Sequence, residues 1–285
     1  MLDDPGAVGQ VVTFDEDQDE SFNLITVRAA LAYDIAPEMT AYVNAARGSK
    51  AGGYQFFSSS ADNSVEQVAF DESSTWSFEA GVRGSAFGGD LRYSAAGFFT
   101  RTKDEQISDL DPLTFTPFTI NLDAETYGAE FEATYAISEN VAVRRQLGLL
   151  DTEVTADDED LREGNELPFS PNVAAGLAID VDLTARDVGL DMPGSVFGFA
   201  NVQYFGEQFT DSFANAETDD YTLFDARIGW RQGNVAIYGY AENLFDGDYE
   251  TNNLNADVNA AAGGPANIVI PGTPRIVGIG LRLTF

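Results

Sequence analysis

The amino-acid sequence predicts an all-β fold, an antiparallel up-and-down transmembrane β-barrel with about 12 strands. Three observations favour this fold class. Strand-like segments alternate apolar and polar residues, the connections between them alternate between short and long, and the chain ends on an apolar strand whose last residue is aromatic. Strands of this kind place lipid-facing and water-facing side chains on opposite faces, as a barrel in an outer membrane requires.

The last eleven residues, Arg275 to Phe285, show the alternation most clearly. Every second side chain is large and apolar: Val277, Ile279, Leu281, Leu283 and Phe285. The residues between them are mostly small or polar, and successive side chains of a strand point to opposite faces. The last strand of a soluble sandwich also shows such a pattern, so the interpretation depends on the rest of the chain.

The composition excludes several classes of protein. The chain has 285 residues with 15 Lys and Arg against 47 Asp and Glu, a formal net charge of −32, which does not suit a nucleic acid partner. Its 44% hydrophobic content, with 21 Phe and 11 Tyr, indicates a folded chain. Because there is no Cys and no His, disulfides, thiolate chemistry and the usual catalytic triads are excluded. We expect no cofactor and no enzymatic activity.

The start of the sequence does not match an exported protein. Met1 to Gly6 carry neither a basic charge nor an apolar run, so they do not form a signal peptide. No apolar run approaches the roughly 18 residues of a membrane helix, but barrel strands need only about 9–11 residues. An outer-membrane protein must be exported, and we therefore expect the natural N-terminus to lie upstream of Met1.

Strand-like segments recur along the first half of the chain, and tight turns join them in pairs. A weak candidate strand lies near Val8–Phe14. The strands after it are expected at Leu24–Tyr33, Met39–Arg47, Thr75–Phe87, Leu91–Thr102 and Thr126–Ile137. Residues that favour turns, such as Pro37 and Gly88-Gly89-Asp90, stand between the members of a pair, so neighbouring strands form antiparallel hairpins. Long polar connections at about 48–73 and up to about Asp123 separate the hairpins.

The second half continues in the same way. The remaining strands are expected at Val141–Leu150, Asn172–Leu183, Val196–Phe205, Tyr221–Arg231, Val235–Asn243 and the C-terminal segment. Ser138-Glu139-Asn140 and Gln232-Gly233-Asn234 are tight turns, whereas the acidic loop at Asp157–Asp160 belongs to a long connection. Because long and short connections alternate, the long ones gather at one end of the barrel, which is the layout of outer-membrane barrels.

The faces of the strands favour a membrane barrel over a soluble sandwich. Phe131, for example, lies between Glu130 and Glu132, and the apolar faces mix Ala and Gly with large residues. Aromatic residues that suit the two membrane interfaces lie near strand ends: Trp76, Tyr127, Tyr135, Trp230 and Phe285. One strand does not fit, because Arg144 and Arg145 are adjacent. One of them must point outward, or the strand is short there.

Six short motifs, in the right order, resemble one family. They are Tyr42–Tyr54, Ser77–Arg83, Ala96–Ile107, Tyr127–Glu132, Glu242–Asp246 with Tyr249, and Pro274-Arg275 ahead of the terminal Phe. Tyr127-Gly-Ala-Glu-Phe-Glu132 looks like the Gly-x-Glu-x-Glu strand of the TonB-dependent outer-membrane receptors. Glu242-Asn-Leu-Phe-Asp246 with Tyr249 looks like their Asn-Leu-Phe-Asp-x-x-Tyr signature, and the resemblance extends from about Tyr33 to the end.

The resemblance implies a 22-stranded barrel closed around an N-terminal plug, integral to the outer membrane of a Gram-negative cell. It also implies uptake of a scarce nutrient, a ferric siderophore, cobalamin or a saccharide, with energy from a TonB-type coupler in the full-length protein. Residues 1–285 resemble only the C-terminal half of such a barrel, and we expect the plug, the TonB-contacting box and the signal peptide to be absent. A fragment that is not competent alone fits best. The alternatives are a small stand-alone barrel of twelve strands and complementation by a separate upstream polypeptide.

Two cations are candidates for substrate binding. Arg47 and Lys50 lie at the top of a strand in an otherwise acidic chain, where an anionic ligand would prefer them. The simpler interpretation is a pair of solvated charges. The acidic segments Asp15–Glu20 and Asp157–Asp160 raise the question of divalent cations, but the first lacks the Gly and Glu that an EF-hand loop requires. Solvated loops explain both segments, so we predict no metal site.

The C-terminal alternation resembles the signal that the outer-membrane assembly machinery reads. Its members are Val277, Ile279, Leu281, Leu283 and Phe285. A lipid-facing strand explains the same residues, and the two roles are compatible. The expected partners are therefore the barrel-assembly machinery, outer-membrane lipid and lipopolysaccharide, together with a small-molecule nutrient.

Two other classes of protein are alternatives to the barrel. A glycoside hydrolase built only on carboxylates would need a pair such as Glu130 and Glu132, but nothing else marks a sugar cleft. A soluble, acidic, Ca²⁺-binding surface β protein is the stronger alternative. It would enter the aqueous phase of a detergent extraction, whereas a barrel would not.

Overall fold

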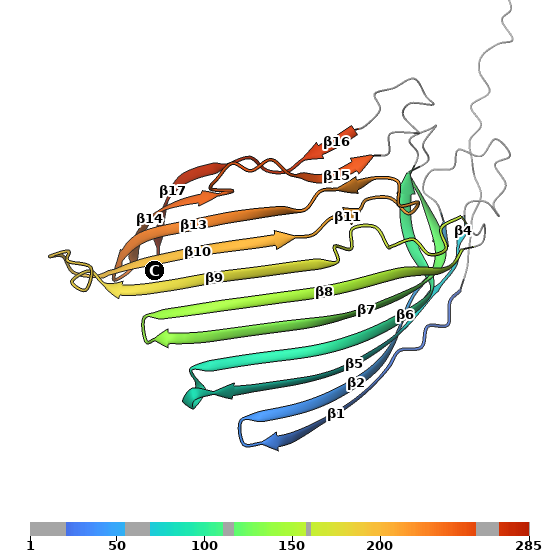
Figure 1. The fold of residues 1–285 in the computed structure, drawn as a ribbon, viewed down its shortest axis with the longest axis horizontal. Helices are drawn as coiled ribbons and strands as arrows, with labels where there is room; N and C mark the ends of the chain where they lie inside the picture. The colour runs from blue at the N-terminus through green and yellow to red at the C-terminus, as the bar shows by residue number, and fades with distance from the viewer. Residues whose placement is uncertain (1–20, 55–68, 111–116, 158–160, 255–267, 285) are drawn as a thin grey trace, which may run out of the picture.

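The main body of the protein is one curved antiparallel sheet of 11 strands, shown in Figure 1. The computed structural model describes residues 21–54, 69–110, 117–157, 161–254 and 268–284. The order of the strands in space follows their order in the chain, which is the up-and-down topology that the sequence predicts. The strands are β1 Val27–Ala36, β2 Met39–Lys50, β5 Ser73–Ala86, β6 Leu91–Leu110, β7 Pro117–Ser138, β8 Val141–Asp157, β9 Val173–Thr184, β10 Ser195–Phe205, β13 Tyr221–Gln232, β14 Val235–Glu242 and β17 Ile276–Leu283.

Three two-stranded sheets belong to the long connections between the main strands. They are β3 Gly53–Tyr54 with β4 Ala69–Phe70, β11 Gln208–Phe209 with β12 Glu217–Thr218, and β15 Glu250–Leu254 with β16 Ile268–Pro271. In Figure 1 these small sheets lie toward the same end of the molecule, opposite the tight hairpin turns. The predicted asymmetry between long and short connections is therefore confirmed.

The register between strands assigns every main-strand residue to one of two faces. Cross-strand partners share a face, so the face of Ile279 can be followed from strand to strand across the sheet. Its row contains Ile279, Gly239, Ile228, Gly198, Val181 and Val141. A second row of the same face contains Ala175, Leu147, Phe131, Ala95, Val82, Ala41 and Tyr33. We call this apolar side the outer face and the opposite, polar side the inner face.

The outer face is exposed in this chain, as expected of a surface that meets lipid rather than a protein core. Ile279 is 85% exposed, and Val277 and Leu281 are 71% and 64% exposed. The packed apolar cluster of the described residues is small and lies beyond the outer-face rows, where Leu122, Ala124 and Val154 are almost fully buried. The sheet therefore does not fold around a core of its own, which distinguishes it from a soluble sandwich.

The tight turn between β5 and β6 depends on glycine. The 3₁₀ turn η2, Phe87–Gly89, joins the two strands, and all three of its residues have positive φ. Gly88 has φ 70° and Gly89 has φ 100°, a backbone conformation that residues with a Cβ rarely adopt. The predicted turn at Gly88-Gly89-Asp90 is thus confirmed, and the positive φ angles of Gly88 and Gly89 explain why glycine occurs there.

Several strand boundaries differ from the sequence prediction, and the largest extension besides those below is that of β8, which ends at Asp157 instead of Leu150. The first strand runs over Val27–Ala36 instead of Leu24–Tyr33. The connection expected to reach Asp123 is short, because β6 continues to Leu110 and β7 begins at Pro117. A β-bulge after Thr102 shifts the register of the hydrogen-bond ladder between β6 and β7. A polar sequence was taken for a loop, but a ladder of backbone hydrogen bonds in water needs no apolar face.

The sheet has two open edges. Among the residues that the structure describes, β1 pairs only with β2 and β17 pairs only with β14, so this part of the chain does not close into a barrel. The weak strand expected at Val8–Phe14 lies outside those residues. No helix in the described ranges is long and apolar enough to cross a membrane.

Candidate functional site

Ion pairs join neighbouring strands on the inner face. The Arg144 guanidinium of β8 lies 2.7 Å from the carboxylate of Asp180 on β9. Arg231 of β13 forms an ion pair with Asp182, which places a second cation on the same side of the sheet. These side chains are about half exposed, so the pairs contribute little stability and remain accessible to water. The inner face is therefore the polar, ligand-accessible side.

Aromatic rings on the inner face surround a third arginine. The Arg227 guanidinium lies 5.8 Å from the ring centre of Phe199 and 5.6 Å from that of Tyr238. A cavity of about 580 Å³ adjoins this group and is also lined by Tyr240 and Glu242. A cation held between aromatic rings, with a carboxylate nearby, suits a ligand that has both flat and charged parts.

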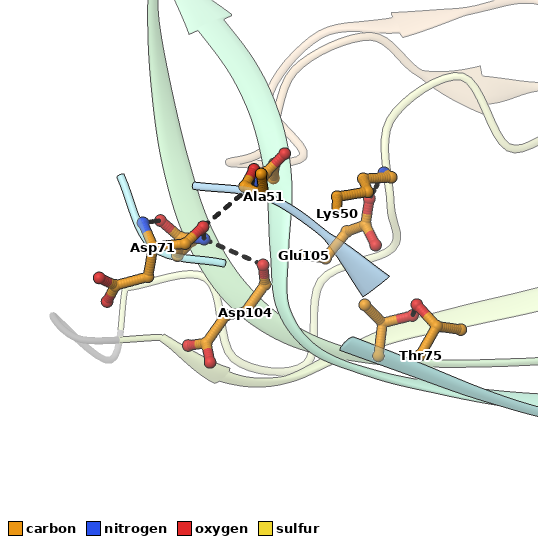
Figure 2. A network of polar contacts seen from close by, with 9 residues as sticks. Lys50, Ala51, Asp71, Thr75, Asp104 and Glu105 are labelled. Carbon is orange, nitrogen blue, oxygen red and sulfur yellow. Dashed lines mark hydrogen bonds and ion pairs between the residues drawn. The ribbon is translucent and has the colours of Figure 1, made fainter. Parts of the chain in front are cut away.

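Lys50, the last residue of β2, lies beside Glu105 of β6, as Figure 2 shows. The Lys50 ammonium lies 2.8 Å from the Glu105 carboxylate. Lys50 follows Arg47 by three residues without a bulge, so the two side chains point to opposite faces. Arg47 pairs with Trp76 on the outer face, and Lys50 pairs with Ser73 on the inner face. The structure thus does not bring the two predicted substrate residues together.

A polar network holds the connection after β2 against the β6–β7 hairpin (Figure 2). The Gln106 side chain donates hydrogen bonds to the carbonyl oxygens of Ala51 and Asp71, at 2.8 and 2.9 Å. The Asn121 amide donates to the carbonyl oxygens of Asp71 and Asp104, at 3.2 and 2.9 Å. Two side-chain amides therefore fix the backbone of the connection after β2. The sequence patterns did not point to Gln106 or Asn121 as residues with this role.

Two further connections pack against each other at the same end. Arg162, in the connection after β8, is only 6% exposed, and its Nε donates a hydrogen bond to Ser212 Oγ at 2.9 Å. Its guanidinium also lies 4.0 Å from the ring centre of Phe213, in the connection after β10. Asn165 donates to the Ser212 carbonyl oxygen at 3.2 Å. These contacts order the loops of β8–β9 and β10–β13 as one unit.

An acidic group in this unit has a perturbed pKa. Burial raises the pKa of Glu166 above its ordinary value, and the carboxylates of Asp151, Glu217 and Glu207 raise it further. Since the folded-state pKa lies above that of the unfolded chain, the charged carboxylate destabilises the folded loop at neutral pH. That penalty is relieved as the pH falls through the folded-state pKa.

We expect Glu166→Gln to raise the melting temperature at pH 7 and to flatten its dependence on pH between 7 and 4.5. The amide has no charge to desolvate, so the pH-dependent penalty disappears. Thermal unfolding in detergent across that range, with hydrogen exchange over residues 161–170, would measure the effect. Glu163→Gln, at an exposed position of the same connection, is the control. An equal response of both variants would contradict the assignment.

The other candidate residues are placed as follows. Val277, Ile279, Leu281 and Leu283 all lie on the outer face of β17, whereas Phe285 lies outside the described residues. The acidic segments Asp15–Glu20 and Asp158–Asp160 also lie outside them. Within the described ranges, no group of three or more Asp and Glu is arranged to hold a metal ion.

The topology, the apolar outer face and the polar inner face define a segment of an outer-membrane β-barrel. Residues 3–244 match the family described as "TonB dependent receptor-like, beta-barrel". The chain belongs to this family, and its place is the outer membrane. The family suspected from the six sequence motifs is therefore confirmed.

Named relatives of the chain are receptors. The pesticin receptor of Yersinia pestis is 26% identical over 256 residues, which cover 89% of this chain and 35% of the relative. The metal-pseudopaline receptor CntO of Pseudomonas aeruginosa is 25% identical, over 86% of this chain and 32% of the relative. The chain thus spans about a third of the length of the curated relatives it matches.

Solved structures share the fold. The ferric yersiniabactin uptake receptor FyuA from Yersinia pestis superposes with a TM-score of 0.74 at 23% identity, over 90% of this chain and 37% of that one. The copper transporter OprC superposes with a TM-score of 0.70 at 17% identity, over 92% of this chain and 40% of that one. The open sheet of 11 strands therefore corresponds to part of a larger barrel.

Proposed function

We propose that this chain forms the C-terminal part of the barrel of a TonB-dependent receptor that takes up a metal chelate across the outer membrane. The observation that carries the proposal is the match to the receptor barrel family over residues 3–244. Among the substrates that the resemblance implied, a metal chelate of the ferric siderophore class is favoured over cobalamin or a saccharide. The names of the relatives, which are receptors for yersiniabactin-bound iron and metal-pseudopaline, support that choice.

The proposal includes a coupled partner and no catalytic step. In the complete receptor a TonB-type coupler would supply the energy, and the barrel-assembly machinery would read Val277, Ile279, Leu281, Leu283 and Phe285. In the part of the chain that the structure describes the sheet has two open edges, and unpaired strand edges are unfavourable in lipid. We therefore propose that this chain is a fragment that needs further upstream strands for uptake.

Of the two predicted substrate-binding cations, Arg47 and Lys50, we propose that Lys50 contacts the substrate. Its side chain lies on the inner face near the long connections and is about 60% exposed, beside Glu105. An anionic chelate entering from that end would meet this ammonium group. Arg47 points to the opposite face, so a contact with the same ligand is not supported by the geometry.

Uptake by the complete receptor that contains this chain tests the proposal. We expect energy-dependent accumulation of radioactive iron from a ferric siderophore, lost when the inner-membrane coupler is deleted. Lys50→Ala should weaken binding of the chelate by about 3–10-fold, the effect of losing one partly exposed charge contact. Lys103→Ala is the matched control, because this lysine also pairs with a carboxylate, that of Asp104. Accumulation that is independent of the coupler would exclude energy-coupled uptake.

A further inference from the structure

We propose that a cavity on the inner face, lined by Arg227, Arg231 and Arg282, binds a small molecule that carries several carboxylate groups. The cavity lies at the end of the sheet with the tight turns, opposite the end that carries Lys50. The binding itself rests on the geometry. Its role in the cell rests on the proposed function, because the cavity would receive the carboxylates of an anionic chelate that leaves the barrel toward the periplasm.

Cross-strand pairing places two of the arginines in one row of the inner face. Arg282 of β17 pairs with Ala236 of β14, and Ala236 pairs with Arg231 of β13. Two strand spacings, or about 10 Å, separate the backbones of the two arginines. The row continues to Ser195 and Thr184, and none of these members carries a carboxylate. The two guanidinium groups therefore stand on either side of a small side chain.

The third arginine belongs to the same strand as Arg231. Arg227 precedes it by four residues in β13, so the two side chains share a face and lie about 13 Å apart along the strand. The Arg227 guanidinium lies 5.6 Å from the ring centre of Tyr238. Arg227, Arg231 and Arg282 line one cavity of about 340 Å³. Three positive charges from two strands thus surround the same space.

Flat aromatic rings form part of the lining. Phe197 and Tyr238 both line the cavity, and their ring centres are 6.4 Å apart. The Phe197 ring lies over Gly229 and the Tyr238 ring lies over Gly280, since a Cβ at either glycine would clash with the ring above it. Because these rings lie along the sheet, they leave the space between the arginines open.

The cavity lies at the end of the molecule with the short connections (Figure 1). Gly233 and Asn234, in the turn between β13 and β14, line it. The Thr284 N–H donates a hydrogen bond to the Asn234 carbonyl oxygen at 2.9 Å, which holds the end of β17 against this turn. Short turns of outer-membrane barrels lie on the periplasmic side. A molecule bound here has therefore crossed most of the length of the barrel.

The positive charge of the cavity is unusual for this chain. The protein has 15 cationic residues against 47 anionic ones, yet no residue that lines the cavity carries a carboxylate. Arg231 forms an ion pair with Asp182. Arg227 and Arg282 have no ion-pair partner among the residues that the structure describes. At least two of the three guanidinium groups are therefore open to an anionic ligand.

The carboxylates of neighbouring rows have other places or partners. Asp180, in the row of Arg227, pairs with Arg144 at 2.7 Å. Asp225, two residues before Arg227, accepts a backbone hydrogen bond from the connection after β14. Glu242 lines the adjoining cavity and not this one. These groups reduce the local positive charge but do not occupy the space between the arginines.

The spacing of the arginines favours several carboxylates over one compact anion. A guanidinium group binds a carboxylate or a phosphate through two parallel hydrogen bonds. Backbones about 10 and 13 Å apart suit oxyanion groups that are spread over a short carbon skeleton. A cavity of about 340 Å³ is at the small end of the range for ligand sites. It therefore fits a small polycarboxylate, or the carboxylate-bearing part of a larger chelate.

Calorimetric titration with citrate, which has three carboxylate groups, measures the binding. The full chain in dodecylmaltoside micelles should bind citrate saturably, and the affinity should fall as ionic strength rises. We expect Arg231→Gln with Arg282→Gln to weaken the affinity about tenfold or more. Ala236→Leu fills the space between these arginines without a change of charge, and should weaken it about 3–10-fold.

Two further variants make the result independent of misfolding. Asp182→Asn should strengthen citrate binding about 2–5-fold, because Arg231 loses its competing carboxylate. Arg83→Gln with Arg92→Gln, on the inner face of β5 and β6, should leave the affinity unchanged. Each variant must retain the circular dichroism of the parent chain. Equal losses in the two double variants would overturn the proposal, as would phosphate or sulfate that binds as tightly as citrate.

Transport by the complete receptor tests the role of the cavity separately. Arg231→Gln with Arg282→Gln should lower the maximal rate of chelate uptake several-fold and leave the affinity of the cell surface for the chelate unchanged. An unchanged maximal rate would exclude the role in release. If the two arginines instead held an acidic segment of the upstream protein, the double variant would lower the melting temperature of the complete receptor and leave citrate binding by the chain unchanged, which would overturn the proposal. No uptake by the unaltered receptor would refute the proposed function and leave the citrate result standing.

Discussion

Replacing Asn243 by alanine is expected to destabilise the chain by about 2 kcal/mol or more. Asn243 follows β14 and is only 6% exposed. Its amide donates to the carbonyl oxygens of Gly247 and Thr273 at 2.9 and 3.1 Å, and its side-chain oxygen accepts from the Gly247 N–H at 2.9 Å. Alanine would remove these three hydrogen bonds of a nearly buried side chain, which costs roughly 1–3 kcal/mol for each partner group that water does not then reach.

The backbone at this position adds to the effect. Asn243 has φ 46°, a left-handed conformation that asparagine tolerates better than alanine. The segment that Asn243 holds leads into the last strand. There Gly272 lies flat against the ring of Tyr249, so closely that a Cβ would clash with the ring carbons, and the Thr273 N–H donates to the Tyr249 hydroxyl. Loss of the Asn243 side chain should therefore increase the mobility of the segment that precedes β17.

Urea unfolding of the chain in detergent measures this prediction, with hydrogen exchange of β17 as a local readout. Asn234→Ala is the control, since Asn234 is an exposed turn residue at the other end of β14 and its side chain makes no hydrogen bond or ion pair within the described part of the chain. We expect the midpoint of Asn243→Ala to fall while that of Asn234→Ala stays close to the parent. Similar midpoints for the two variants would show that the buried amide does not hold the connection.

The sequence predicted the faces of the sheet better than the ends of its strands. Period-two alternation follows from the strand backbone itself, so the outer-face residues of β7 and β17 could be identified without coordinates. Where β6 passes Thr102, the residues become polar while the backbone ladder continues across a bulge. Hydrogen bonding between strands leaves no pattern in side-chain polarity, and for this reason the longer hairpin was missed.

The candidate site was less predictable, because its contacts join residues distant in sequence. In the sequence, Asn243 stands out only as part of a family signature. Its structural role includes a hydrogen bond to Thr273, 30 residues later in the chain. Arg47 and Lys50 looked equivalent as cations near the end of a strand. The period-two alternation predicts that the two side chains lie on opposite faces if the strand extends to Lys50, as β2 does. The predicted strand ended at Arg47, and that boundary concealed the difference.

Replacing Arg145 by leucine is expected to stabilise the chain in a lipid bilayer by about 1–3 kcal/mol. Of the two adjacent arginines, Arg145 is the one on the outer face, where its cross-strand neighbours are Ala133 and Leu177. An arginine on the lipid face of a barrel costs about 2–4 kcal/mol at the bilayer midplane and little at the interface. Arg145 is four residues, or about 13 Å of strand, from the start of β8 at Val141, so an intermediate cost applies.

Arg144 provides the matched control, because it has the same side chain one residue away on the inner face. Its guanidinium pairs with Asp180 at 2.7 Å and lies 5.9 Å from the ring centre of Phe199. Arg144→Leu removes both contacts and gains no transfer into lipid, so it should destabilise the chain by up to about 1 kcal/mol. Urea unfolding from phosphatidylcholine vesicles compares the two variants with the parent. If Arg145→Leu were no more stable than Arg144→Leu, lipid would not cover this face of β8, and the assignment of the outer face would have to be reversed.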